Sequence, residues 1–444
     1  MDWLTADKSG LAVDPESISF IKTPTDYYDS LLNGIRTAKH RIILSSLYLG
    51  TGELEIKLVQ ALENAIEANP NLEVGILLDY LRGTRGAPTK SSSTMLASIA
   101  DKANVSFYHT PDLRGFTKSS LPARMNEIVG LQHMKFYVFD DDVIISGANL
   151  SDSYFVDRQD RYVMIKDNKS LVSFFDSVFK AVSGSSFRLK GDGKLELPNE
   201  CTVHPYEGDR QAFTDDLAAK LRAIAPIPSA LPDSKTSDTL VYPFIQYGPV
   251  GINDEVDLLT RLFGRAQPDL AVTVATGYFN PHDRYLDQLL NQATYPASFV
   301  FAAPDANGFY NGEGLSGYIP HLYVNLSKDL YEAAKAKQRD LTLHEYSRPG
   351  WTFHGKGIWI EQKTAGISAT MLGSSNYGYR SASRDMEAQV LVVTSNDKLR
   401  ARLEEERKAL LEFTSIVDAA TFRRPDHCVP YWVKLFSRAF KHFF

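Results

Sequence analysis

The stretch His133-Met-Lys135-Phe-Tyr-Val-Phe-Asp140 and its later copy, His354-Gly-Lys356-Gly-Ile-Trp-Ile-Glu361, decide the fold and the chemistry predicted for this 444-residue chain. In both stretches a histidine and a lysine are two positions apart, and a carboxylate follows five positions after the lysine. Side chains alternate along an extended strand, so this spacing places the imidazole and the ammonium on one face. An isolated His-x-Lys pair is more often an accident, but two copies with the same companions are not expected by chance.

A turn follows each motif beyond a second apolar run. The first turn is Gly147-Ala-Asn149, and the second is Gly373-Ser374-Ser375-Asn376. We expect Asn149, Ser374 and Asn376 to bind the substrate beside the histidines. Each half of the chain then offers one imidazole, one ammonium and one carboxamide, which are groups suited to holding and attacking a phosphate.

The segments around the first motif alternate between helix and strand. The apolar spacing predicts helices at 25–38 and 53–68 and strands at 41–50 and 72–78. Strands separated by single helices are typical of an α/β layered domain. The same order returns at 252–263, 270–279, 283–292 and 297–303, ahead of the second motif. The sequence therefore predicts two similar α/β/α domains related by a pseudo-dyad, with the active site at their interface.

The domain boundaries follow from composition. Prolines and small polar residues at 226–237 cannot build a core, so we predict a linker at 226–239. The first domain then covers residues 1–225, the second covers 240–425, and 426–444 forms a separate tail. In that tail, residues 431–444 have the pattern of an amphipathic helix with Trp432 and Leu435 on the apolar face, together with Phe436, Ala439, Phe440 and Phe443. Such a helix either lies on an anionic membrane surface or packs on the protein's own core.

Arginines and tyrosines near the expected strand ends are candidate substrate ligands. Arg82 and Arg85 lie among glycines directly after strand 72–78, at the edge where α/β sheets bind ligands. A guanidinium group suits phosphate oxygens, and Arg380 is a third candidate for holding an anionic acceptor. Tyr48 and Tyr278 occupy matching positions in the two halves.

The composition excludes several classes of protein. A content of 43% hydrophobic and 23% charged residues is that of a globular protein, and the net charge of −6 argues against a nucleic-acid partner. Two cysteines are too few for a disulfide framework. No apolar run is long enough to span a membrane, and the start lacks a targeting signal. We therefore expect either that the protein is cytosolic or that it has a targeting segment which is not part of this sequence.

Two histidines and two lysines across a shared cleft suit phosphoryl transfer through a covalent intermediate. One imidazole would attack phosphorus, while the other protonates the leaving oxygen and later takes a proton from the acceptor. The lysines would stabilise developing charge, so we predict neither a metal nor a cofactor. Asp140 and Glu361 are expected to orient or balance the other groups. The candidate catalytic residues are His133, Lys135, Asp140, His354, Lys356 and Glu361.

These motifs resemble the HKD signature of the phospholipase D superfamily, from which the second copy departs by having Glu361 in place of aspartate. The loops at Arg82–Gly86 and Ala302–Phe309, together with His354–Trp359, narrow the resemblance. They are similar to those of the eukaryotic, mitochondrial phosphatidylglycerophosphate synthases over about residues 17–425. The resemblance implies that CDP-diacylglycerol donates a phosphatidyl group to glycerol 3-phosphate and that CMP leaves. It also implies a peripheral protein on the matrix side of the mitochondrial inner membrane.

The resemblance implies that His133 is the nucleophile and His354 the general acid and base, although the near-symmetric motifs leave that order open. Three alternatives to this function remain. A related phosphatidyltransferase would use serine as its acceptor, and a phospholipase or nuclease would use water or nucleic acid. A lipid-binding protein without catalysis would tolerate loss of either histidine, yet both motifs are intact.

Overall fold

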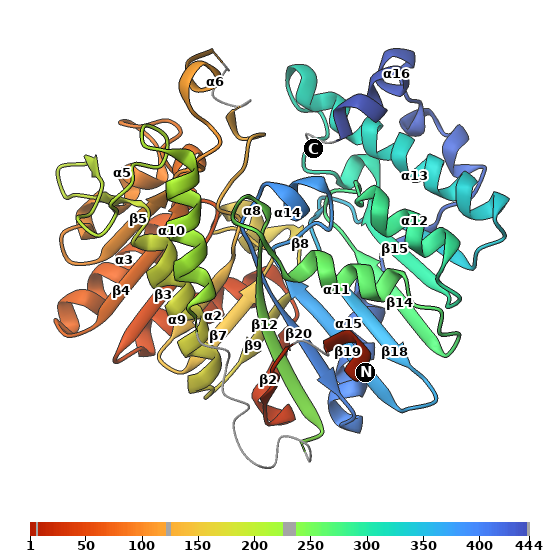
Figure 1. The fold of residues 1–444 in the computed structure, drawn as a ribbon, viewed down its shortest axis with the longest axis horizontal. Coiled ribbons are helices and arrows are strands. Elements are labelled where there is room, and N and C mark those ends of the chain that lie inside the picture. Colours follow the sequence, from red (N-terminus) through yellow and green to blue (C-terminus); the bar gives the residue numbers. More distant parts are fainter. Residues whose placement is uncertain (6–7, 121–125, 225–236, 442–444) are drawn as a thin grey trace.

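The computed structural model describes residues 1–5, 8–120, 126–224 and 237–441. They form two sheets side by side, each covered by helices (Figure 1). The predicted α/β class and the pair of similar layered units are confirmed. The predicted linker lies outside the described residues up to position 236, and Thr239 begins a strand. The domain boundaries given above remain a prediction.

The first sheet is built by the first half of the chain. In spatial order its strands are β11 (Leu195–Glu196), β10 (Phe187–Leu189), β5 (Asn104–Tyr108), β4 (Glu73–Asp79), β3 (Arg41–Ser45), β6 (Phe136–Phe139), β7 (Asp142–Ser146), β9 (Tyr162–Ile165) and β2 (Ile18–Ile21). Strands β3, β4 and β5 are parallel, whereas β6 and β7 form an antiparallel hairpin that joins the trio at β3. The first motif enters this sheet through β6.

The second sheet repeats that order. Its strands are β1 (Leu11–Ala12), β12 (Thr239–Tyr247), β20 (Glu387–Thr394), β19 (Ile367–Gly373), β18 (Gly357–Gln362), β14 (Leu270–Ala275), β15 (Ala297–Ala302), β16 (Leu341–Tyr346) and β21 (Thr414–Ile416), with β13 (Ile252–Asn253) beside β12. The run β20-β19-β18-β14-β15-β16 corresponds strand for strand to β9-β7-β6-β3-β4-β5. The second motif therefore enters through β18, at the place that β6 takes in the first sheet.

The alternation of apolar side chains along β3 explains the layers. Ile42 and Leu44 face α2 (Pro24–Thr37) and α3 (Glu53–Ala68), whereas Ile43 faces α9 (Lys169–Ser183) and α10 (Arg210–Arg222). In the second sheet, one face packs against α11 (Asp254–Phe263), α12 (Asp283–Asn291) and α13 (Ile319–Ala336), and the other against α15 (Asp397–Leu411). Each sheet is thus buried on both faces, as parallel sheets require.

One apolar cluster joins the two halves. It combines β6, β7 and β9 of the first sheet with β12 and β20 of the second. Helix α15 adds polar contacts across the junction, where Arg161 donates to both carboxylate oxygens of Glu406 at 2.9 and 2.7 Å and to the Met371 carbonyl at 3.2 Å. Strand β1 pairs with β12, so Leu11 and Ala12 belong to the second sheet. These contacts hold the two sheets in a fixed position relative to each other.

The final helix, α16 (Tyr431–Phe440), packs on α13 (Figure 1). Val433 and Ser437 are buried in this contact, and Asn325 donates a hydrogen bond of 3.1 Å to Ser437. Trp432 and Leu435, on the predicted apolar face, stay exposed, and Phe443 lies outside the described residues. In the part of the chain that the structure describes, no helix is long and apolar enough to cross a bilayer.

Candidate active site

The two histidine segments lie at the interface, just before β6 and β18. The amide of His133 donates to the carbonyl of Met386 at 2.9 Å, and the amide of His354 donates to the carbonyl of Gln159 at 2.8 Å. In the second case the contact continues a parallel pairing between β17 (Thr352–Phe353) and β8 (Arg158–Gln159). Each histidine is therefore positioned by the backbone of the opposite half.

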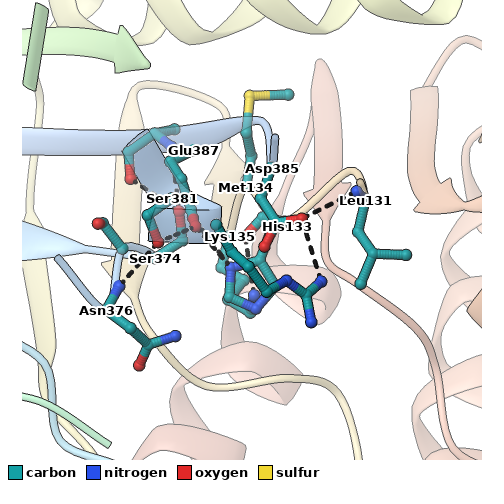
Figure 2. A network of polar contacts seen from close by, with 12 residues as sticks. Leu131, His133, Met134, Lys135, Ser374, Asn376, Ser381, Asp385 and Glu387 are labelled. Carbon is teal, nitrogen blue, oxygen red and sulfur yellow. Dashed lines mark hydrogen bonds and ion pairs between the residues drawn. The ribbon is translucent and has the colours of Figure 1, made fainter. Parts of the chain in front are cut away.

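Each imidazole also meets a carboxylate from the opposite half. Nδ1 of His133 lies 3.1 and 2.9 Å from the two carboxylate oxygens of Glu387 (Figure 2), and Nδ1 of His354 lies 2.6 Å from Oδ2 of Asp160. All four side chains are buried. An ionised carboxylate only accepts hydrogen bonds, so Nδ1 carries the hydrogen and Nε2 is left with a lone pair. The Nε2 atom of each imidazole can therefore act as a nucleophile or as a base.

The two lysines lie beneath the imidazoles. Nζ of Lys135 donates to the carbonyl of His133 at 2.7 Å, and Nζ of Lys356 donates to the carbonyl of His354 at 3.0 Å. Nζ of Lys356 also lies 2.6 and 3.0 Å from the ring nitrogens of His354. Both lysines are fully buried. When protonated, the two Nζ groups are therefore positioned to attract an anion that binds beside the histidines.

Burial sets the charge state of these groups. It lowers the pKa of Lys135 to about 7 and that of Lys356 to about 8, and it raises the pKa of Asp160 to about 6. Burial also lowers the pKa of both histidines, that of His354 further because Lys356 adds its charge. The pKa of Glu387 nevertheless falls below its ordinary value, since attraction to His133 and Lys135 outweighs burial. Before a substrate binds, both imidazoles are therefore uncharged at neutral pH, as an attacking nitrogen must be, and an imidazole that acts as a general acid must first gain a second proton.

The carboxylates within the motifs lie elsewhere. Asp140 turns away at the far end of β6, where it accepts the backbone amides of Lys39, His40 and Arg41 at 2.8, 2.7 and 3.0 Å. Glu361 is exposed on β18. A strand advances about 3.3 Å per residue, so five residues carry each group roughly 16 Å beyond its lysine. The expectation that these carboxylates orient the histidines is corrected here, because Glu387 and Asp160 contact the imidazoles instead.

A chain of hydrogen bonds supports His354. Nδ2 of Asn149 donates to the hydroxyl of Tyr154 at 3.0 Å, and that hydroxyl lies 3.3 Å from Nε2 of His354. Tyr154 belongs to α8 (Asp152–Val156), directly after the first Gly-rich turn. In that turn, a Cβ on Gly147 would come within 2.8 Å of Asp160 and 3.0 Å of Lys356, so glycine lets both groups approach.

Two serines position Glu387, the carboxylate that contacts His133. Ser381, on α14 (Tyr379–Ser383), donates to Glu387 at 2.8 Å and accepts the amide of Asn376 at 3.2 Å (Figure 2). Ser374 accepts the amide of Ala388 at 3.1 Å, which fixes the strand that carries Glu387. The side-chain oxygens of Asn149 and Asn376 are both buried with no hydrogen-bond partner among the described residues. Two matching carboxamides are thus left with capacity for a ligand at the interface.

Aromatic and cationic side chains surround His354. The ring of Tyr278 lies edge-on at 5.4 Å from the imidazole, and the guanidinium of Arg82 lies 4.4 Å from the ring centre of Tyr48. Burial raises the pKa of Tyr278, and the nearby positive charges of Arg158, Arg82 and Arg380 oppose this by lowering it. Of the arginines predicted from the sequence, Arg82 and Arg380 therefore act electrostatically on Tyr278, the ring that lies against His354. Among the residues that the structure describes, no three His, Cys, Asp or Glu side chains are grouped to hold a metal ion.

Comparisons with known proteins agree with this geometry. A family model described as "Cardiolipin synthase, PLD-like domain" matches residues 31–182. The mitochondrial CDP-diacylglycerol–glycerol-3-phosphate 3-phosphatidyltransferase of Gallus gallus is 38% identical over all of this chain and 86% of its own length. The Homo sapiens protein of that name is 36% identical over all of this chain and 85% of its own length. The chain belongs to this phosphatidyltransferase family.

A solved structure shares the whole architecture with this member of the phosphatidyltransferase family. The phosphatidylserine synthase of Haemophilus influenzae Rd KW20 matches with a TM-score of 0.76 and covers 99% of this chain and 98% of its own. At 20% identity the match establishes the fold. The architecture of two similar halves in one chain is therefore shared with a protein that has a different name.

Sequence reasoning missed four residues that contact the two histidines or their neighbours in this phosphatidyltransferase. They are Glu387, Asp160, Tyr154 and Arg158, whose guanidinium lies 4.5 Å from the ring centre of Tyr154. One signal could have revealed the carboxylates. Asp160 stands two residues before β9, and Glu387 is the first residue of β20; both apolar strands follow a motif hairpin, so the two carboxylates occupy similar places in the repeat.

Proposed function

We propose that the chain transfers a phosphatidyl group from CDP-diacylglycerol to glycerol 3-phosphate and releases CMP, the committed step toward phosphatidylglycerol and cardiolipin. The supporting observation is the pair of buried histidines at the interface, each of which contacts a carboxylate from the other half and the lysine of its own motif. Membership of the phosphatidyltransferase family supports the identity of the donor and acceptor.

The reaction proceeds in two displacements. His354 takes up a second proton when the anionic donor binds beside it. Nε2 of His133 then attacks the phosphatidyl phosphorus, the bond from phosphorus to the CMP oxygen breaks, and the His354 imidazolium gives that oxygen its proton. The hydroxyl of glycerol 3-phosphate then attacks phosphorus, gives its proton to His354 and breaks the bond to His133. Glu387 and Asp160 hold the imidazoles in the required tautomer and balance their charge. Lys135, Lys356, Asn149 and Asn376 stabilise the oxygens on which charge develops.

An acceptor panel tests this proposal. Purified protein is incubated with CDP-diacylglycerol labelled in the phosphatidyl phosphorus and, separately, with glycerol 3-phosphate, serine or buffer alone, while CMP and labelled lipid are both followed. We expect both products to form with glycerol 3-phosphate and neither above background with the His354→Ala variant. Phosphatidylserine formation would indicate the serine-accepting reaction, and phosphatidic acid in every tube would indicate a phospholipase. Either result would contradict the proposal.

We propose that Arg82 and Arg85, together with Arg380, hold a substrate phosphate at the interface. Changing Arg82 or Arg85 to alanine removes a charge-assisted hydrogen bond, which is worth roughly 1.5–3 kcal/mol. The expected result is an increase of about 10- to 150-fold in the KM for one substrate, measured by CMP release with each substrate varied in turn. If both variants keep wild-type constants for both substrates, the loop after β4 has a structural role only.

We propose that the chain attaches to an anionic membrane surface through residues 431–444, on the matrix side of the mitochondrial inner membrane. Tyr431, Trp432 and Leu435 are 81%, 42% and 64% exposed, although α16 already packs on α13 through Val433. An exposed aromatic and aliphatic face beside Lys434 is the pattern of an interfacial helix. The lipid donor supplies the reason, because its headgroup must reach the histidines while its acyl chains stay in the bilayer.

A double variant, Trp432→Ser with Leu435→Ser, tests the attachment. Full burial of each large apolar side chain contributes about 1.5–3 kcal/mol, so we expect sedimentation with anionic liposomes to fall by at least about tenfold. The melting temperature should change by only a few degrees, since Leu435 is mostly exposed and Trp432 is partly exposed, with an edge contact to the ring of Tyr318 at 4.7 Å between ring centres. Ile416→Ser, at a residue that is 66% exposed on β21, serves as the matched control. Undiminished liposome binding by the double variant would contradict the proposal.

A further inference from the structure

Four arginines from both halves of the chain converge on Glu127 and Ile128. Nη1 of Arg82 lies 4.0 Å from one carboxylate oxygen of Glu127, and Arg85 forms an ion pair with the other. From the second half, Arg380 donates to the carbonyl of Glu127 at 3.0 Å, and Arg384 donates to the carbonyl of Ile128 at 3.0 Å. A short piece of chain is thus held by cations at the interface.

This arginine cluster lies beside the reacting groups. Glu127 precedes His133 by six residues, and Arg380 also donates to Asp385 at 3.1 Å, two residues before Glu387. The charges of Arg82 and Arg380 both act on the hydroxyl of Tyr278, whose ring lies against His354. An anion held by these arginines would therefore lie close to the imidazoles.

A carboxylate binds to a cluster of arginines more weakly than a phosphate does. Guanidinium groups pair with both, but a phosphate monoester offers three oxygens and up to two negative charges where Glu127 offers two oxygens and one. The Glu127 side chain is only 17% exposed, so its charge is largely desolvated and interacts strongly with the arginines. Because Glu127 is part of the same chain, it competes with any incoming anion at a high effective concentration.

We propose that Glu127 occupies the position of the acceptor's phosphate and must be displaced by it, so that Glu127 sets the enzyme's preference for a doubly charged acceptor. This inference rests on the proposed transfer to a phosphate-bearing acceptor. A neutral or singly charged molecule would not displace the carboxylate from Arg82 and Arg85. Glu127 is accordingly a specificity-determining residue that stands outside the bond-making steps.

The Glu127→Gln variant tests this proposal, because it keeps the side chain's size and removes its charge. With a competitor removed from the arginines, we expect the KM for glycerol 3-phosphate to fall by about tenfold. We also expect inorganic phosphate, titrated by calorimetry without any donor, to bind about tenfold more tightly. Glu412→Gln, at an exposed residue beyond the end of α15, is the matched control and should leave both values unchanged.

The outcomes separate this inference from the proposed function. Failure of the wild type to form lipid product from glycerol 3-phosphate would overturn the proposed function, while the phosphate titration would still decide the role of Glu127. Equal or weaker phosphate binding by Glu127→Gln would overturn the inference, and a raised KM would show that Glu127 organises the arginines for the acceptor. A thermal melt confirms that the variants are folded.

Discussion

Replacing His133 or His354 with alanine is expected to lower kcat/KM for CDP-diacylglycerol by at least about a thousandfold, the scale observed when one member of a nucleophile–base unit is lost. Without His133 no nitrogen attacks phosphorus, and without His354 the CMP oxygen leaves unprotonated. Because the two groups act in one sequence of steps, the double variant should be little worse than either single variant. The measurement is CMP release at saturating glycerol 3-phosphate.

His40→Ala is the matched control for the histidine variants, because His40 is an exposed histidine of the first half. Its activity should stay at the wild-type level. A melt of each variant separates lost chemistry from lost structure. If either active-site variant retained more than about a tenth of wild-type activity, its loss would be far smaller than the expected thousandfold, and that histidine would have no place in the mechanism.

The second large effect is expected at the carboxylates that contact the imidazoles. Asp160→Asn and Glu387→Gln preserve shape but remove the charge that fixes the tautomer and stabilises an imidazolium, and the corresponding change in a catalytic triad costs about ten-thousandfold. We expect each variant to lose at least about a hundredfold in kcat, with a smaller effect on KM. Steady-state kinetics with both substrates measure the two constants.

The carboxylates inside the motifs supply matched controls for this second prediction. Glu361→Gln changes an exposed residue and should leave kcat within about twofold. Asp140→Asn should act on stability instead, by about 1–3 kcal/mol, because Asp140 accepts three backbone amides. If Glu361→Gln were as damaging as Glu387→Gln, the assignment made from the structure would be incorrect.

The sequence predicted the repeat because its signals are local. Apolar spacing within α3 and α12, and the continuous apolar run of β4, depend only on neighbours along the chain. The predicted bounds of these elements agree with the structure to within one or two residues at each end. Helix α15 was not predicted, because charged residues surround the few apolar positions, Leu399, Leu403 and Leu410, that it buries.

The pairing of histidine with carboxylate could not be predicted for a physical reason. Asp160 serves His354, and Glu387 serves His133, so each pair joins residues about 200 or more positions apart in opposite halves of the chain. Spacing along the sequence favours Asp140 and Glu361, which are near in the chain but far in space. Only the way in which the two sheets pack brings the correct carboxylates to the imidazoles.

The stereochemistry at phosphorus tests most directly whether a histidine carries the phosphatidyl group. The donor is CDP-diacylglycerol made chiral at the phosphatidyl phosphorus by isotopic or sulfur substitution, and the configuration of the lipid product is determined. Two successive in-line displacements each invert phosphorus, so the mechanism proposed here predicts overall retention. Net inversion would mean that glycerol 3-phosphate attacks the donor directly, and it would contradict the covalent intermediate on His133.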